Sequence, residues 1–151
     1  MSYFIMINKM LIQVENFNGC HVSNAVAYII TASEYIAIGK RKNGKFGFPG
    51  GKIEKFDRSP FKAAKRETLE EFGWHKFPFC YKIIPFIWNN HTAIFLCFTN
   101  EKLPHFIKNN EMIDINLVNI EELKHSLNGN TLWKLRESEI NSTKAIINMF
   151  F

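Results

Sequence analysis

Apolar residues come in short runs along most of this chain, and turn residues separate the runs. Alternating or continuous apolar runs bounded by Gly, Pro, Asn or Asp are typical of β-strands. We therefore expect strands at Tyr3–Ile7, Met10–Val14, Val22–Thr31, Tyr35–Lys40, Phe79–Trp88, Thr92–Thr99 and Ile113–Ile120. Asn8–Lys9 and Asn16–Gly19 carry turn residues between the first strands, and Phe46–Pro49 is expected to be extended because it ends in proline.

The pattern changes to helical spacing in the middle of the chain. Ser59 is suited to the N-cap and Pro60 to the first helical position. Core-facing positions then recur at i, i+3, i+7 and i+11, at Phe61, Ala64, Thr68 and Phe72. Gly73 is expected to end this helix as the residue after its last turn.

Two further helices are expected near the C-terminus, at Glu121–Leu127 and Glu137–Phe151. The segment Gly50–Asp57 is expected to be irregular, because its paired glycines permit backbone conformations closed to other residues. Strands, one central helix, strands and a terminal helix predict an α+β fold with a mixed β-sheet packed between helices. Residues 1–151 are expected to form a single domain.

Composition narrows the class of partner. The net charge of +5 favours an anionic substrate, but the basic residues form no stripe of the kind that binds nucleic acid. The three cysteines, Cys20, Cys80 and Cys97, form no CxxC motif and are expected to be free thiols in a reducing compartment. Since the sequence shows no signal peptide and no run of membrane-spanning length, we expect a soluble, cytoplasmic protein.

The predicted central helix carries three carboxylates, Glu67, Glu70 and Glu71. Spacings of i+3 and i+4 place them within an arc of about 100° on one helical face. Like charges this close ionise reluctantly unless a cation lies among them. Oxygen ligands without Cys or His suit Mg²⁺ or Mn²⁺. On helix spacing alone, a solvated, glutamate-rich surface is the more common explanation.

The residues around these carboxylates resemble the Nudix hydrolases. The family motif is G-x5-E-x7-R-E-U-x-E-E-x-G-U, where U is bulky and apolar. Gly51 opens the motif here, Arg66–Trp74 reproduces its second half, and Phe46–Gly51 is similar to the family's aromatic lead-in to Pro-Gly-Gly. The chain departs from the motif at Asp57, where the family has Glu, and at Thr68, where an apolar residue is usual. Eight residues, rather than seven, separate Asp57 from Arg66.

The resemblance implies an α/β/α sandwich that hydrolyses a nucleoside diphosphate linked to another moiety, by attack of metal-activated water on phosphorus. Glu67 and Glu71, with the Gly50 carbonyl, are then the expected metal ligands. Glu70 is expected to be a further ligand or the group that takes the proton of the water. The implied cofactor is Mg²⁺, with Mn²⁺ as an alternative.

Arg66 joins Glu67 and Glu70 as a candidate catalytic residue under this resemblance. We expect it to pair with Asp57 and to hold the loop against the helix rather than to contact substrate. The alternative is an exposed ion pair between Arg66 and Glu70, which are spaced i,i+4.

Further site residues are predicted on weaker grounds. The candidate substrate-binding residues are Arg41, Lys52 and Trp88. The candidates for a distal general base are Glu101, Glu111 and Asp114. For the charged candidates an ordinary surface position is an equal or better explanation, and for Trp88 so is packing in the core.

Length and a composition rich in Lys, Asn, Ile and Phe resemble small T-even phage Nudix hydrolases of ADP compounds, which would place the protein in a host cytoplasm. ADP-ribose, FAD and dinucleoside polyphosphates are therefore the expected substrates. A nucleoside triphosphate pyrophosphatase, an mRNA-decapping enzyme and a non-catalytic nucleotide sensor are the alternatives. Nucleic acid and membranes are not expected partners, and a homodimer is left open.

Overall fold

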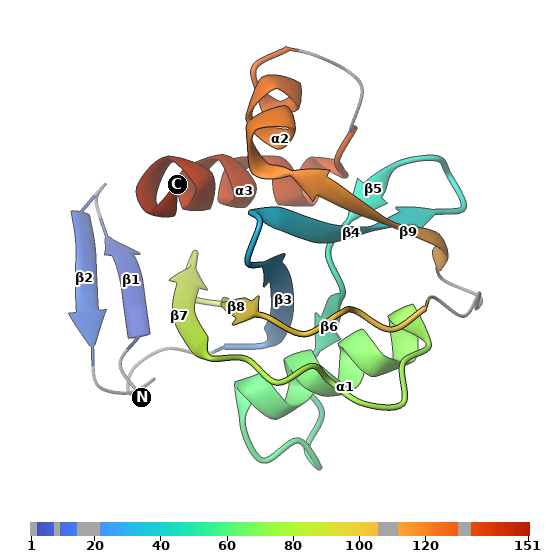
Figure 1. The fold of residues 1–151 in the computed structure, drawn as a ribbon. Helices are drawn as coiled ribbons and strands as arrows, with labels where there is room; N and C mark the ends of the chain where they lie inside the picture. The colour runs from blue at the N-terminus through green and yellow to red at the C-terminus, as the bar shows by residue number, and fades with distance from the viewer. Residues whose placement is uncertain (1–2, 8–9, 15–21, 106–111, 130–133) are drawn as a thin grey trace.

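The computed structural model describes residues 3–7, 10–14, 22–105, 112–129 and 134–151 (Figure 1). The predicted turns at Asn8–Lys9 and Asn16–Gly19 lie outside these residues, as do Cys20 and Glu111. Within the described part, no helix is long and apolar enough to cross a membrane.

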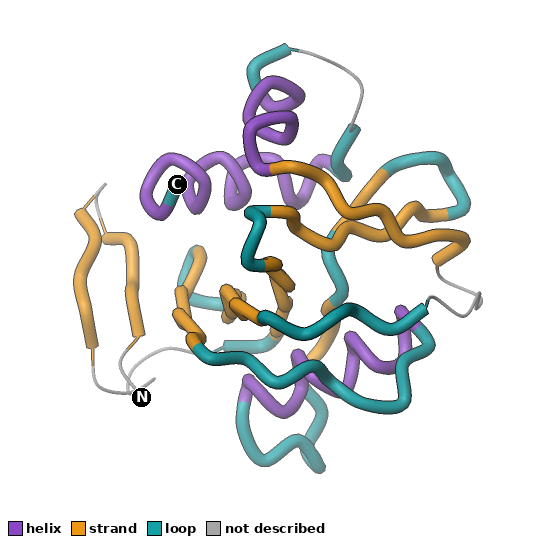
Figure 2. The backbone as a smooth tube through the Cα atoms, viewed as in Figure 1, coloured by secondary structure: helices purple, strands orange, loops and turns teal. Residues whose placement is uncertain are grey.

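A mixed β-sheet forms the centre of the fold (Figure 2). Its strands are β1 (Tyr3–Ile7), β2 (Met10–Val14), β3 (Asn24–Thr31), β4 (Tyr35–Arg41), β5 (Phe46–Gly47), β6 (Gly50–Lys52), β7 (Lys82–Trp88), β8 (Thr92–Thr99) and β9 (Met112–Asn119). The order is β2-β1-β7-β8-β3-β4-β5, while β6 pairs with β3 and β9 pairs with β4. The β1–β7 and β3–β8 pairs are parallel and the others antiparallel.

In the described part of the chain, three helices flank the sheet: α1 (Pro60–Phe72), α2 (Ile120–Leu127) and α3 (Glu137–Phe150). The predicted ends of α1 are confirmed. The Ser59 hydroxyl accepts a hydrogen bond from the Lys62 amide at 3.2 Å, and Pro60 is the first helical residue. Gly73 adopts φ 68°, a left-handed conformation that glycine takes without strain.

Two apolar clusters fill the space on the two faces of the sheet. On one face, Ala63, Ala64 and Phe72 of α1 pack with strand residues such as Phe95. On the other face, Leu123 of α2 and residues of α3 such as Ile146 and Ile147 pack with other strand residues, including Tyr28 and Phe86. Figure 1 shows α1 on one side of the strands and α2 with α3 on the other. The predicted α/β/α sandwich is therefore confirmed.

The segment after the glycines differs from its prediction. Gly50–Lys52 is not irregular but forms β6, with Gly50 opposite Val26 and Gly51 opposite Ala25 of β3. A Cβ on Gly50 would lie 2.5 Å from the Ala25 carbonyl oxygen, so only glycine lets the two backbones approach this closely. The glycine pair thus serves close strand packing, and the irregular loop begins after Lys52.

Other element boundaries differ from their predicted positions by a few residues. β7 begins at Lys82 rather than Phe79, because the Phe79 carbonyl accepts a hydrogen bond from the Thr99 hydroxyl at 2.7 Å and its ring is 70% exposed. β9 ends at Asn119, whose side chain caps α2 by accepting a hydrogen bond from the Glu121 amide at 2.9 Å.

Candidate active site

Glu67 lies directly over the glycine strand. A Cβ on Gly51 would lie 2.7 Å from both the carboxyl carbon and Oε1 of Glu67. Residue 51 must therefore lack a side chain for the Glu67 carboxylate to occupy its present place. The strand supplies a flat backbone surface, and α1 supplies the acid above it.

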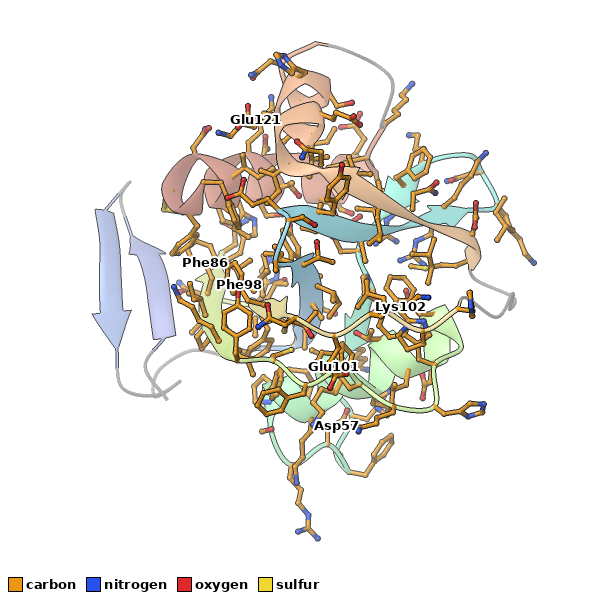
Figure 3. The ribbon with its side chains drawn as sticks, viewed as in Figure 1. Asp57, Phe86, Phe98, Glu101, Lys102 and Glu121 are labelled. Atoms are coloured by element: carbon orange, nitrogen blue, oxygen red, sulfur yellow. The ribbon has the colours of Figure 1, made fainter. Side chains whose placement is uncertain are left out.

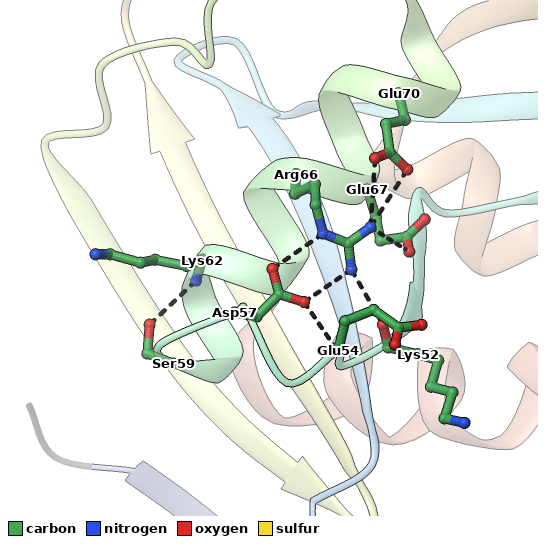
Figure 4. Close-up of polar contacts among 8 residues, drawn as sticks. All are labelled: Lys52, Glu54, Asp57, Ser59, Lys62, Arg66, Glu67 and Glu70. Carbon is green, nitrogen blue, oxygen red and sulfur yellow. Dashed lines mark hydrogen bonds and ion pairs between the residues drawn. The ribbon is translucent and has the colours of Figure 1, made fainter.

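Arg66 connects the loop, the strand and the helix (Figure 4). Its Nε and Nη2 donate to the two carboxylate oxygens of Asp57 at 2.9 and 2.8 Å. Nη2 also donates to the Lys52 carbonyl at 3.2 Å, while Nη1 donates to Glu67 at 3.0 Å and to Glu70 at 3.3 Å. The expected pairing of Arg66 with Asp57 is thus present, and so is the weaker contact with the exposed Glu70.

Asp57 meets Arg66 despite the extra residue between them. Its side chain is only 4% exposed, and its Oδ2 also accepts a hydrogen bond from the Glu54 amide at 2.8 Å. The Arg66 guanidinium holds the pKa of the Asp57 carboxyl below its ordinary value of 3.8, although burial acts in the opposite direction. The same bond raises the pKa of Arg66. Asp57 therefore remains charged wherever the protein is folded near neutral pH.

The Asp57–Arg66 pair predicts a pH-dependent contribution to stability. Because the pKa of Asp57 is lower in the folded state, its contribution is present above pH 3.8 and is lost as the pH falls through the folded-state pKa. Asp57→Asn should therefore lower the free energy of unfolding at pH 7 and lower it less at pH 3, which is below the unfolded-state pKa, where the contribution of the charge has begun to fall. Chemical denaturation at both pH values measures this. Glu54→Gln, an exposed acid in the same loop, is the matched control, and an equal loss at both pH values would contradict the pairing.

Glu71 faces away from Arg66 and pairs with Arg41 of β4. Arg41 Nη2 lies 3.2 Å from Glu71 Oε2, and the two side chains are 14% and 3% exposed. The same nitrogen donates to the Phe48 carbonyl at 3.4 Å. Arg41 is thus not part of a solvated basic loop but lies in the wall of the site, beside one of the predicted metal ligands.

The donor set of this site fits a hard divalent cation. Glu67, Glu70 and Glu71 supply carboxylate oxygens on adjoining turns of α1, and the glycine strand supplies carbonyl oxygens, which are the ligands that Mg²⁺ prefers. Among the described residues no three His, Cys, Asp or Glu side chains converge as a metal centre, since arginines hold the glutamates in two directions. Binding would require these side chains to turn toward one ion.

A cavity of about 490 Å³ adjoins the glycine strand on the face opposite α1. Gly50 and Gly51 form part of its wall, as does Trp88 at the end of β7. Asn24, Asn89 and Ser138 are among the polar residues that line it. The glycine strand therefore lies between the carboxylates of α1 and this cavity.

A buried carboxylate from α3 also lines the cavity. Glu139 Oε1 accepts a hydrogen bond from the Phe48 amide at 3.1 Å, and Oε2 accepts one from Arg136 Nε at 3.0 Å. Beside it Tyr28, which hydrogen-bonds Thr143 at 2.9 Å, stacks on Phe48 with ring centroids 3.9 Å apart. Burial raises the pKa of Tyr28, so this phenol stays neutral.

The remaining predicted residues are dispersed. The Lys52 side chain is exposed, and only its carbonyl contacts Arg66. Glu101 is exposed beyond the Thr99 end of β8 (Figure 3). Gly51 lies opposite Ala25, and Ala25 pairs with Ala93 near the start of β8. About 20 Å of strand separates Ala93 from Thr99, so Glu101 lies far from Gly51.

Asp114 likewise lies away from the carboxylates of α1. It is exposed on β9 and opposite Lys40. Two-residue alternation puts it on the face of Val118, which packs in the cluster under α2 and α3. The structure thus brings Glu67, Glu70, Arg66 and Gly50 together, with Glu71 and Arg41 beside them, but not Glu101 or Asp114.

Several lining residues were not among the predicted site residues, notably Asn24, Asn89 and Glu139. None belongs to a short motif, because each comes from a different element and the sheet order alone brings them together. The only sequence signal was Asn89-Asn90, a turn dipeptide that places polar side chains directly after Trp88. Both asparagines have positive φ, which asparagine tolerates better than most residues.

The chain belongs to the NUDIX family, since the model of the NUDIX domain matches residues 21–137. It is therefore a hydrolase of phosphate anhydrides. No curated protein matches the chain in sequence.

Solved structures share the fold at low sequence identity. A MutT protein from Methanosarcina mazei Go1 is 17% identical, with 89% of this chain and 96% of that chain covered and a TM-score of 0.57. A MutT structure from work on Aliivibrio salmonicida and Vibrio cholerae is 21% identical, covering 88% and 99%, with a TM-score of 0.57. An Ap4A hydrolase from C. elegans is 14% identical, covering 84% and 99%, with a TM-score of 0.53. At these identities the likeness shows the fold and not the substrate.

Proposed function

We propose that this Nudix pyrophosphohydrolase depends on Mg²⁺ and cleaves a nucleoside diphosphate linked to another moiety, with a preference for ADP compounds. The observation that carries the proposal is the cavity of about 490 Å³ that shares Gly50 and Gly51 with the carboxylate site. Its volume lies in the range of small-molecule sites, roughly 300–1,000 Å³. A nucleoside in the cavity would bring its diphosphate to the glycine strand, which carries Glu67 on its other face.

The residues of α1 have distinct proposed roles. Glu67 and Glu71, with the Gly50 carbonyl and in part Glu70, would hold Mg²⁺ or Mn²⁺. Such an ion would supply positive charge that acidifies water and offsets the negative charge of the diphosphate. Glu70, whose side chain is 58% exposed, has the solvent access needed to take a proton and pass it to water.

Arg66 and Arg41 act differently from the glutamates in this proposal. Arg66 is a positioning residue, because its donors are directed at Asp57, Glu67 and the Lys52 carbonyl. Arg41 offsets the charge of the buried Glu71 and adds positive potential near the phosphates. We do not propose Glu101 or Asp114 as the general base, given their positions. Glu111, outside the described residues, stays a prediction.

Two features of the cavity suit a base that carries an exocyclic amino group, as adenine does. Trp88 offers an aromatic face on which a base can stack. Glu139 is an acceptor, and each of its oxygens has a second lone pair beyond the bonds to Phe48 and Arg136. A carboxylate matches the exocyclic amino group of adenine, which is a hydrogen-bond donor.

Trp88→Leu is expected to raise KM for an ADP compound about tenfold with little change in kcat. Stacking of a base on an aromatic ring contributes about 1–3 kcal/mol, and leucine keeps the apolar contacts of Trp88 without the ring. Steady-state kinetics measures this effect. Tyr81→Leu, an exposed aromatic residue outside the cavity, is the control and should leave KM unchanged. A loss in kcat alone would place Trp88 outside the substrate site.

A panel of nucleotides tests the proposed function. The protein is incubated with Mg²⁺ and ADP-ribose, FAD, a dinucleoside polyphosphate, each nucleoside triphosphate or capped RNA, and the products are separated. Release of AMP from ADP-ribose or FAD supports the proposal. Pyrophosphate from triphosphates would replace it with a pool-cleansing activity, and release of the cap would indicate decapping. Binding without turnover of any compound would indicate a nucleotide sensor.

A further inference from the structure

A second cavity, of about 340 Å³, lies between α1 and the segment that leads into β7, and it shares no lining residue with the first. Phe61 and Lys65 of α1 form one wall, and the segment 76–80 with Ile83 forms the other. Lys65 is roughly 200° around the helix from Glu67. The second cavity is therefore separate from the proposed catalytic centre, and it needs its own explanation.

The half-buried thiol of Cys80 lines this second cavity. Its Sγ donates a hydrogen bond to the Pro78 carbonyl at 3.4 Å, which fixes the thiol near the cavity wall. Behind it lies Cys97 of β8, which is fully buried. The Thr99 hydroxyl donates to the Phe79 carbonyl and the Tyr81 amide donates to the Phe98 carbonyl, so Cys80 is held beside this end of β8. An accessible thiol thus has a second thiol as its direct neighbour.

The electrostatic surroundings favour the thiolate form of Cys80. Interaction with the Cys97 thiol lowers the pKa of the Cys80 thiol, and Lys65 acts in the same direction, whereas burial and Glu101 act against them. Burial raises the pKa of Cys97 well above its ordinary value. Since the thiolate is the nucleophile, Cys80 is the reactive member of the pair and Cys97 is protected.

The lysines and aromatic rings at the second cavity indicate which kind of small molecule would bind beside Cys80. Lys65 Nζ lies 5.4 Å from the centroid of the Phe61 ring and 5.8 Å from that of Phe77. Lys76 also lines the cavity. The two ammonium groups favour an anionic molecule, and the apolar wall accommodates its uncharged part.

We propose that Cys80 is a thiol–disulfide exchange site for small anionic disulfides, and that Cys97 resolves the product into an internal disulfide. In the first step the Cys80 thiolate attacks one sulfur of the disulfide, the S–S bond breaks, and one thiolate leaves with the electron pair. In the second, the Cys97 sulfur, after losing its proton, attacks Cys80 Sγ and expels the second thiolate. The two cysteines lose two electrons and two protons, and the small disulfide becomes two thiols.

An internal Cys80–Cys97 disulfide would tie the segment before β7 to the middle of the sheet. β8 pairs with both β3 and β7, and its Phe95 lies 5.0 Å from Phe61 of α1 between ring centroids. The bond would therefore constrain the unfolded chain and raise the unfolding temperature. This consequence is independent of the proposed substrate.

Glutathione disulfide is a suitable anionic probe, and Cys20→Ser removes the third cysteine from every variant. Intact mass and peptide mapping should show a Cys80–Cys97 disulfide in the Cys20→Ser variant, and a single glutathione on Cys80 in the double variant Cys20→Ser, Cys97→Ser. The double variant Cys20→Ser, Cys80→Ser should stay unmodified while it is folded. The proposal would be overturned if Cys97 in this last variant reacted as fast as the Cys20→Ser variant does, or if the Cys20→Ser variant did not react at all.

The preference for anions is tested on the Cys20→Ser background without altering the pair. Lys65→Gln should slow the reaction with glutathione disulfide several-fold relative to the uncharged 2-hydroxyethyl disulfide. Lys62→Gln, an exposed lysine of the same helix that does not line the second cavity, should leave the ratio of the two rates unchanged. Equal slowing of both reagents by Lys65→Gln would contradict an anionic preference.

Discussion

Glu71→Gln is expected to lower kcat by about 1,000-fold at saturating Mg²⁺, a loss comparable with removing one group that stabilises developing negative charge. The amide is neutral and a weaker ligand for Mg²⁺ than the carboxylate. Because Glu71 is 3% exposed and paired with Arg41, the substitution also removes a largely buried ion pair. We therefore expect a loss of stability as well, of at most about 3 kcal/mol.

The two effects of Glu71→Gln are separable. Activity is measured well below the midpoint of thermal unfolding, and titration with Mn²⁺, followed by its paramagnetic signal, reports metal binding without turnover. Arg41→Gln provides a matched comparison, since it breaks the same ion pair but leaves the proposed ligand in place. Wild-type turnover and wild-type Mn²⁺ affinity in Glu71→Gln would remove Glu71 from the metal site.

Gly51→Ala is expected to reduce kcat/KM by about 100-fold while the protein stays folded. The new methyl group would lie 2.7 Å from the Glu67 carboxylate, which is the flexible end of a side chain and can move. Displacement of a catalytic group by about 1 Å is sufficient for a loss of this size. Thermal unfolding should change little, and the kinetic assay measures the main effect.

Gly50→Ala, one residue earlier, should mainly lower stability, whereas Gly51→Ala should mainly lower activity. Its methyl group would lie 2.5 Å from the Ala25 carbonyl oxygen and 2.8 Å from the Val26 Cα, so the backbone of β3 or β6 must shift. We expect a loss of roughly 1–3 kcal/mol in the free energy of unfolding, measured by denaturation. If both alanine variants lost stability equally and kept activity, Glu67 would not depend on the bare strand surface.

Local signals predicted the elements well because each rests on a few neighbouring residues. Ser59, Pro60 and Gly73 determined the ends of α1, and the apolar runs located the main strands. The prediction was wrong for Gly50–Lys52, because glycine indicates conformational freedom whereas here its small size serves close packing of two strands. Which of the two roles a glycine has depends on the strand that packs against it, and the local sequence does not show that neighbour.

The site was predictable only where its chemistry is contiguous. The spacing of Glu67, Glu70 and Glu71 gives their common face directly, and the partner of Arg66 followed from the resemblance to the family. The cavity was not predictable, because Asn24 and Glu139 meet only through the order of the sheet. The partnership of Arg41 with Glu71 is also non-local, since it joins β4 to α1.

The multiple contacts of Arg66 make the length of the preceding loop a variable on which evolution can act. One guanidinium joins Asp57, the Lys52 carbonyl and Glu67, so the anchorage depends on a carboxylate reaching it and not on a fixed count of residues. A shorter acid and one additional residue satisfy the same bonds here. We therefore expect an insertion in the loop before α1 to be tolerated while a carboxylate still reaches Arg66, and loss of either partner to break this connection.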